Sequence, residues 1–211
     1  MLTADHFFDD HQRATVEAAM ARIIPTDDTP GAREAGTIEF LDSYLAGLGR
    51  IYAKPDGSGF EQLSGKRAEA WRRRIERIRA VYVAGIEDLD ARSGSAFGAE
   101  FATLDPAQQD AILRQLDPDA RTEGDAGGPP PPLQQTKAEI DLEFFPLLCL
   151  HTRQGFYADP IYGGNRGRVG WDTIGFPGPV SLAEVHTGRY STLAWFAEHQ
   201  PEHDGDTDRG A

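Results

Sequence analysis

Apolar residues recur at helical spacing in four stretches of the chain, and this pattern predicts four helices. We expect the first from about Asp9 or Asp10 to Ile24, the second over 32–48, the third over 66–91 and the fourth from Pro106 onward. The apolar positions behind these predictions are Val16, Ala19, Met20, Ile23 and Ile24, then Ile38, Leu41, Leu45 and Leu48, then Trp71, Ile75, Ile78, Tyr82, Ile86 and Leu89, and finally Ala111, Ile112 and Leu116. No strand pattern competes with them, so the sequence favours a mainly α-helical fold.

Residues at the expected helix ends support these boundaries. Pro25 should stop the first helix, because a proline disfavours helical geometry in the residue before it. Gly49 is a plausible stop for the second helix. Asp105 should cap the fourth, with Pro106 in the first helical position and Gln108 or Gln109 supporting a capping box.

The third helix carries a run of arginines on its polar side: Arg72, Arg73, Arg74, Arg77 and Arg79. An anion-binding site is one interpretation of this run. A solvated helix face, or an ionic match to an acidic partner, is the interpretation we favour.

The second half of the chain is less regular. Residues 117–135 are rich in proline and glycine, so we expect a surface loop or a partly disordered link there. A fifth helix is expected over 136–152, and Pro146 should kink or break it. Residues 155–178 combine glycines and aromatics without a period, which predicts a long, ordered, irregular loop of the kind that is often functional.

Composition sets the domain organisation. With 211 residues, of which 39% are hydrophobic, the chain can bury one core. We therefore expect a single helical domain over 1–198, made of about five helices and a long irregular C-terminal segment rich in glycine and aromatic residues. Residues 199–211 form an acidic tail that should be disordered.

The charge and the single cysteine exclude several functions. A net charge of -13 disfavours nucleic acid and anionic lipid surfaces as partners. Cys149 alone rules out intrachain disulfides and clusters held by cysteines of this chain. Apolar runs are too short for membrane insertion, and the N-terminus has no export signal. We expect a cytoplasmic chain; a periplasmic one is the alternative if a twin-arginine signal was removed.

Motifs for catalysis and cofactor binding are absent from the sequence. It has no dinucleotide fingerprint after a strand, no P-loop, no HExxH and no GxSxG. The pairs His6 with His11 and His199 with His203 lie near the termini, where firm metal ligation is disfavoured. His151 is expected to be a hydrogen-bonded structural residue. We therefore expect no catalytic residue, no metal and no cofactor in this chain.

Two segments resemble a known family. Residues 22–36 read RIIPTDDTPGAREAG, and residues 151–178 contain GFYADPIYGGN and then GW followed by GFPG. Together with Phe7-Phe8 ahead of the first helix, they resemble the gluconate 2-dehydrogenase subunit 3 family over nearly the whole chain. The resemblance implies a small subunit whose partner is a large FAD-carrying flavoprotein of the glucose–methanol–choline type. A cytochrome c or another electron acceptor often completes such complexes.

The resemblance favours a non-catalytic accessory subunit that binds and stabilises the flavoprotein, which would oxidise a sugar, a glycoside or an alcohol. A dedicated assembly or export chaperone of that flavoprotein is the alternative. Exported members of the family carry a twin-arginine signal on this subunit, and its absence here argues against an export role. A stand-alone metal-binding protein or enzyme is a third hypothesis, which would need ligands from the chain termini or from Asp27 and Asp28.

The irregular C-terminal segment is the predicted partner surface. Tyrosine, tryptophan and arginine dominate interface energies, and glycines let a partner backbone approach closely. Purely internal packing is a rival explanation for Trp171 and Phe176. The predicted partner-binding residues are Tyr157, Tyr162, Gly163, Gly164, Asn165, Arg166, Arg168, Trp171 and Phe176.

Overall fold

The computed structural model describes residues 6–117, 138–176 and 178–188, together with residues 190, 193 and 197. Within these residues the chain is mainly helical, without a β-strand, as the hydrophobic pattern predicted. The α-helices are α1 (Asp10–Ile23), α2 (Thr37–Ala46), α3 (Gly65–Phe97), α4 (Pro106–Leu116), α5 (Phe144–Tyr157), α6 (Val169–Thr173) and α7 (Ala183–His186). Short 3-10 helices are η1 (Leu48–Arg50), η2 (Phe101–Thr103), η3 (Glu139–Asp141), η4 (Pro160–Tyr162) and η5 (Arg166–Arg168).

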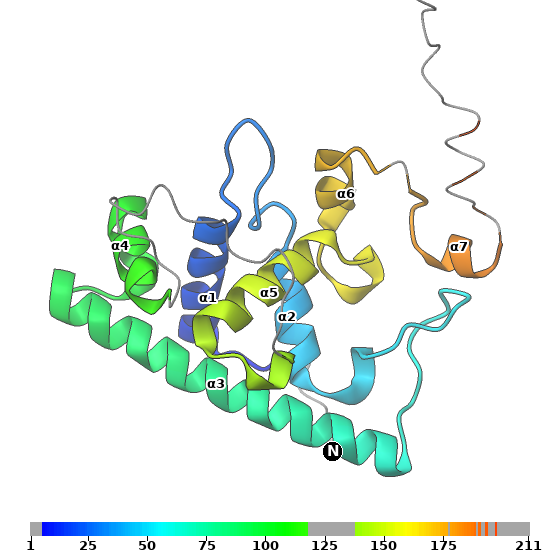
Figure 1. Cartoon of the computed structure of the whole chain (residues 1–211), viewed down its shortest axis with the longest axis horizontal. Coiled ribbons are helices and arrows are strands. Elements are labelled where there is room, and N and C mark those ends of the chain that lie inside the picture. Colours follow the sequence, from blue (N-terminus) through cyan, green and yellow to red (C-terminus); the bar gives the residue numbers. More distant parts are fainter. Residues whose placement is uncertain are drawn as a thin grey trace, which may run out of the picture.

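Helix α3 runs along one side of the molecule, and the other long helices pack above it (Figure 1). Helices α2 and α5 share the most extensive contact between two elements, and α1 packs against both of them. Helix α4 covers the C-terminal part of α3, while α6 and α7 lie at the opposite end of the molecule.

The predicted starts of α1 and α4 are confirmed by their caps. The Asp9 carboxylate accepts a hydrogen bond from the Gln12 amide at 2.8 Å, and the Gln12 side-chain oxygen accepts one from the Asp9 amide at 3.3 Å. The Asp105 carboxylate accepts from the Gln108 amide at 2.9 Å in the same reciprocal arrangement. Each box satisfies amides that have no partner inside the helix.

The predicted start of α2 and the predicted end of α3 were wrong. Helix α2 begins at Thr37 rather than 32, because residues 32–36 form turns and Gly36 adopts a left-handed conformation with φ 63°. Helix α3 runs to Phe97, where Gly98 caps it with φ 70° and its amide donates to the Gly94 carbonyl. The last turns lack an apolar stripe in the sequence, so periodicity gave no sign of them.

The prediction of a kink at Pro146 was also wrong. Helix α5 begins at Phe144, so Pro146 lies in its first turn. Amides there have no acceptor within the helix, so the missing N–H of proline removes no hydrogen bond. The helix ends at Tyr157, beyond the expected residue 152. The predicted proline-rich loop, except for Asp117, and the acidic tail 199–211 lie outside the described residues.

The segment after α5 consists of successive short helical turns rather than an irregular loop. Left-handed residues separate these turns: Gly163, Asn165, Gly167 and Arg168 all have positive φ. Gly163 ends η4, Asn165 precedes η5, Gly167 lies inside η5, and Arg168 precedes α6. These left-handed positions keep the helical turns short.

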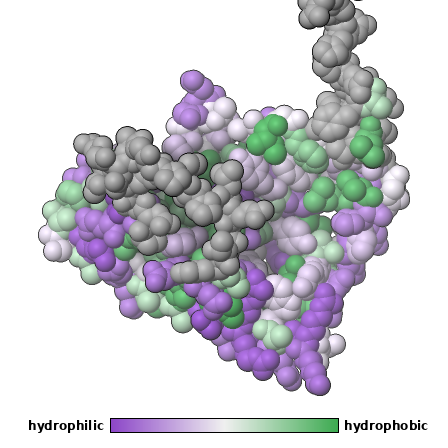
Figure 2. Space-filling model, viewed as in Figure 1, coloured by the Kyte–Doolittle hydropathy of each residue, from purple (hydrophilic) through white to green (hydrophobic). Residues whose placement is uncertain are grey.

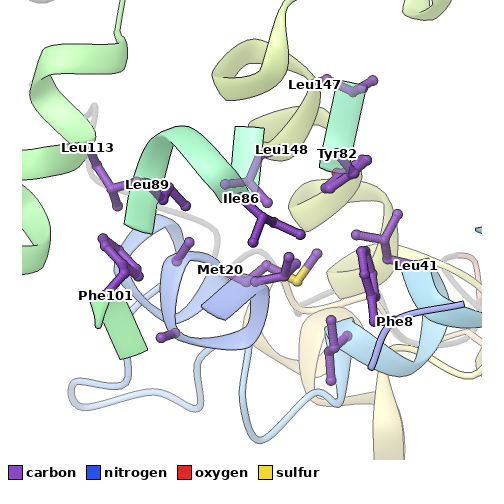
Figure 3. Close-up of a cluster of buried hydrophobic side chains, with 14 of the residues drawn as sticks. Phe8, Met20, Leu41, Tyr82, Ile86, Leu89, Phe101, Leu113, Leu147 and Leu148 are labelled. Carbon is purple, nitrogen blue, oxygen red and sulfur yellow. The ribbon is translucent and has the colours of Figure 1, made fainter. Parts of the chain in front are cut away.

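A shared hydrophobic core holds the long helices together (Figure 3). Tyr82 of α3 is fully buried near its centre, and its ring meets Phe8 and Phe144 edge-on. The core residues labelled in the figure are Phe8, Met20, Leu41, Tyr82, Ile86, Leu89, Phe101, Leu113, Leu147 and Leu148.

The arginine run of α3 is only partly a solvated face. Arg74 donates to Glu139, and Arg79 donates to the Leu45 carbonyl at 2.7 Å. The run therefore also ties α3 to its neighbours. No helix in the described part of the chain is long and apolar enough to cross a membrane.

Candidate partner-binding site

The two sequence segments singled out above lie against each other in the fold. The Arg166 amide donates to the Ala35 carbonyl at 2.8 Å, joining residues 22–36 to residues 151–178. A methyl group added at Gly163 would lie 3.3 Å from the Glu39 carbonyl oxygen. The segments therefore build one continuous structure around α2 and α5.

Glycines in the C-terminal segment allow backbone to pack directly on backbone within this chain. A methyl group at Gly164 would lie 2.1 Å from the Gly155 carbonyl oxygen, and one at Gly170 would lie 1.9 Å from the Phe156 carbonyl oxygen. Real Cβ atoms do not come so close to another atom. The expected close approach at Gly164 is thus made by helix α5 of the same chain, not by a partner.

Asn165 and Trp171 are likewise committed to internal contacts. Asn165 is fully buried, donates to the Ala158 carbonyl at 2.9 Å and accepts from the Gly170 amide at 2.8 Å. Trp171 is 4% exposed, donates to the Tyr157 carbonyl at 2.8 Å and meets Phe176 edge-on. Internal packing, which was the rival explanation for Trp171, therefore accounts for the contacts of both residues. They fix the shape of the segment and offer little surface to a partner.

Other predicted residues do reach the surface. Tyr157 is 41% exposed, and the side chain of Arg166 is 63% exposed. Tyr162 and Phe176 are half-buried. Arg168 is also half-buried and donates to the Gly178 carbonyl at 2.9 Å.

Apolar side chains that sequence reasoning missed extend this surface. Ile174 is 59% exposed, Val180 72% and Val185 40%. Hydrophobic patches are visible near α6 and α7 in the space-filling view (Figure 2). These residues are isolated in sequence, so no periodicity pointed to them.

A groove of about 500 Å³ opens beside this surface. Helices α2, α3 and α5 form its walls together with η1, η3 and η4. Its lining residues are Phe40, Tyr44, Arg50, Ile51, Trp71, Arg74, Glu139, Gln154, Tyr157, Ala158, Asp159, Tyr162 and Leu182. Tyr157 and Tyr162 are the only predicted partner-binding residues among them.

A buried carboxylate lies at the inner wall of the groove. Glu139 accepts hydrogen bonds from the Tyr44 hydroxyl at 3.0 Å, from His151 Nε2 at 2.9 Å and from the Arg74 guanidinium. Burial alone would raise the pKa of Glu139, but the hydrogen bonds and charges of His151 and Arg74 outweigh it and lower the pKa to about 2. The group is therefore an ionised anchor at neutral pH and not a proton donor.

The network continues into the core. His151 is fully buried, and its Nδ1 lies 2.9 Å from the Tyr82 hydroxyl. Burial, with the nearby Glu139 charge, raises the pKa of Tyr82 well above its usual value. His151 is thus the hydrogen-bonded structural histidine that the sequence suggested.

The described residues contain no group of three or more metal-ligating side chains placed to hold an ion. His6 pairs with Asp42 and His11 with Asp90, so these two histidines do not converge. Asp27 accepts from the Thr29 amide at 2.8 Å, in the turn-forming role expected of it. His199 and His203 lie outside the described residues.

Comparison with known proteins identifies the family. The family model described as gluconate 2-dehydrogenase subunit 3 matches residues 10–178. The chain belongs to the gluconate 2-dehydrogenase subunit 3 family. No curated protein and no solved structure matches it.

Membership in the gluconate 2-dehydrogenase subunit 3 family makes the chain a small subunit of a dehydrogenase complex. The match covers all of α1 to α6 and includes both packed segments. It ends at Gly178, so Val180 and Val185 lie beyond the family pattern.

Proposed function

We propose that this chain is the non-catalytic small subunit of an FAD-dependent dehydrogenase complex. It binds and stabilises a large flavoprotein of the glucose–methanol–choline type that oxidises a sugar, a glycoside or an alcohol. The observation that carries the proposal is the exposed apolar surface next to the rigid C-terminal segment, in a member of a dehydrogenase-subunit family.

Most of the exposed large apolar side chains among the described residues lie in the C-terminal part of the chain. Tyr157, Ile174, Val180 and Val185 all lie in the last quarter of the described chain. Contiguous exposed apolar surface marks interaction sites in soluble proteins. The packed glycines and Asn165 fix the backbone between Gly155 and Gly170, and order that exists before binding lowers the entropy cost of binding.

Stabilisation of the partner follows from mass action. A subunit that binds only the folded flavoprotein shifts its folding equilibrium by an amount that grows with subunit concentration. FAD would reside in the large subunit, and a cytochrome c or other acceptor would take the electrons onward. This chain would supply binding surface and no reacting group.

Coexpression with a candidate flavoprotein of the glucose–methanol–choline type from the same source tests the proposal. A tag on the flavoprotein should recover both chains in a fixed ratio that persists through gel filtration. A chain that assists folding and then leaves would raise the flavoprotein yield but would be missing from the purified material, which would favour the chaperone alternative. Absence of both effects would refute the proposed partnership.

A further inference from the structure

The aromatic groove lies directly beside the exposed apolar surface. Phe40 and Tyr44 stack with ring centroids 6.3 Å apart, and Trp71 meets Tyr44 edge-on at the same centroid distance. On the other side, Tyr162 packs edge-on against Phe60, and its hydroxyl accepts from the Ala53 amide at 3.0 Å. The walls are therefore ordered by contacts within the chain and do not need an occupant to form.

The two carboxylates that line the groove are already satisfied. Glu139 accepts from three side chains, as described above. Asp159 accepts from the Ile161 amide at 2.9 Å, from the Ser181 hydroxyl at 2.9 Å and from the Leu182 amide. Both carboxylates are thus held in place by contacts within the chain.

Arg50 is different. It lies at the end of η1, is exposed, and lines the groove. It makes no ion pair or hydrogen bond with any residue that the structure describes. The groove thus combines aromatic walls with one available cation, which is complementary to an apolar group that carries a carboxylate nearby.

We propose that this groove receives a segment of the large subunit in which a bulky apolar side chain lies close to a carboxylate. The apolar side chain packs between Tyr44, Trp71 and Tyr157, and the carboxylate pairs with Arg50. This inference rests on the proposed function, since it names the contact by which the two subunits recognise each other.

Continuity of the surface favours a protein segment over a small molecule. Tyr157 lines the groove and is also 41% exposed at its edge. Leu182 also lines the groove, its amide donates to Asp159, and it lies in sequence between the exposed residues Val180 and Val185. A chain lying across that edge would cover these apolar side chains together, whereas a small molecule would leave Val180 and Val185 in water.

Photo-crosslinking in the coexpressed complex tests the inference. A benzophenone amino acid replaces Tyr157 in one variant and Phe97 in the other. The two are matched in exposure, at 41% and 39%, but Phe97 ends α3, whereas the groove is lined by Trp71 and Arg74 near the start of that helix. We expect flavoprotein adducts from position 157 only, mapped to a segment with a bulky apolar residue near an acidic group.

Charge reversal provides an independent readout. Arg50→Glu should weaken binding of the flavoprotein about tenfold or more, while Arg114→Glu, on the exposed side of α4, should leave the affinity unchanged. Replacing the mapped partner carboxylate with lysine should restore the affinity of Arg50→Glu. Circular dichroism confirms that each variant is folded.

Several outcomes would overturn the inference. A stable complex with no adduct from position 157, or with equal affinity for Arg50→Glu and wild type, would refute the groove contact while leaving the partnership intact. A small molecule found in the groove of the purified complex by native mass spectrometry would also overturn it. Failure of the wild-type pair to associate would refute the proposed function and the inference together.

Discussion

Replacement of Glu139 by glutamine should destabilise the fold by about 2–3 kcal/mol at neutral pH. The side chain is 10% exposed and accepts three hydrogen bonds, two of them from Arg74 and His151. Lowering its pKa from 4.5 to about 2 corresponds to an upper limit of about 3 kcal/mol, at about 1.36 kcal/mol per pH unit. Partial access of solvent reduces that figure, while loss of the charge beside Arg74 adds to the cost.

The stabilisation by Glu139 should decrease as the pH falls. A carboxylate with a depressed folded-state pKa contributes stability that is fully present above about pH 4.5 and is lost as the pH falls toward 2. Urea unfolding of wild type and Glu139→Gln should therefore differ most near neutral pH, and the two stabilities should converge only as the pH falls to about 2. Glu76→Gln, an exposed substitution on α3, is the control and should change stability by less than about 0.5 kcal/mol. A Glu139→Gln protein as stable as the control at neutral pH would refute the anchor role.

Three further experiments, two with substitutions and one with a thiol reagent, test the packing. Gly164→Ala should lower the free energy of unfolding by about 2 kcal/mol or more, because the added methyl group meets the Gly155 carbonyl of α5. Gly94→Ala, which has open space around it, is the control and should be neutral or stabilising. Equal melting temperatures for the two variants would contradict this account. Tyr82→Phe should lower the free energy of unfolding in urea by about 1–2 kcal/mol, since His151 loses a buried hydrogen-bond partner. An unchanged urea midpoint would show that the hydrogen bond between Tyr82 and His151 does not contribute to stability. Burial raises the pKa of the Cys149 thiol to about 11, so a thiol reagent at mildly alkaline pH should label it slowly until urea is added; fast labelling of the folded chain would show the thiol to be accessible.

Local signals predicted part of the fold well. The caps at Asp9 and Asp105 act within a few residues, so the starts of α1 and α4 were readable from the sequence. Pro146 was misread, because a proline is tolerated in a first turn and disruptive in an interior, and the sequence did not show where the helix began. The start of α2 was likewise mispredicted, because Gly36 adopts a left-handed conformation that the neighbouring residues do not indicate.

The candidate site depends on contacts between distant parts of the chain, which explains what sequence reasoning missed. Glu139 meets Arg74 and Tyr44 only after η3, α3 and α2 have come together. Sequence motifs identified the segment that contains Tyr157 and Trp171, but a motif does not distinguish residues that face outward from residues that pack inward. The structure separates them: Tyr157 is exposed, and Trp171 is buried.

The central claim is that this chain binds and stabilises a flavoprotein without carrying flavin itself. The most direct measurement is the rate at which the purified flavoprotein loses FAD on warming, followed by flavin fluorescence, with and without stoichiometric amounts of this chain. We predict markedly slower loss in the presence of the chain, no flavin bound to the chain alone, and an effect that saturates as the complex forms. An unchanged rate of FAD loss, with the two proteins eluting separately, would contradict the account.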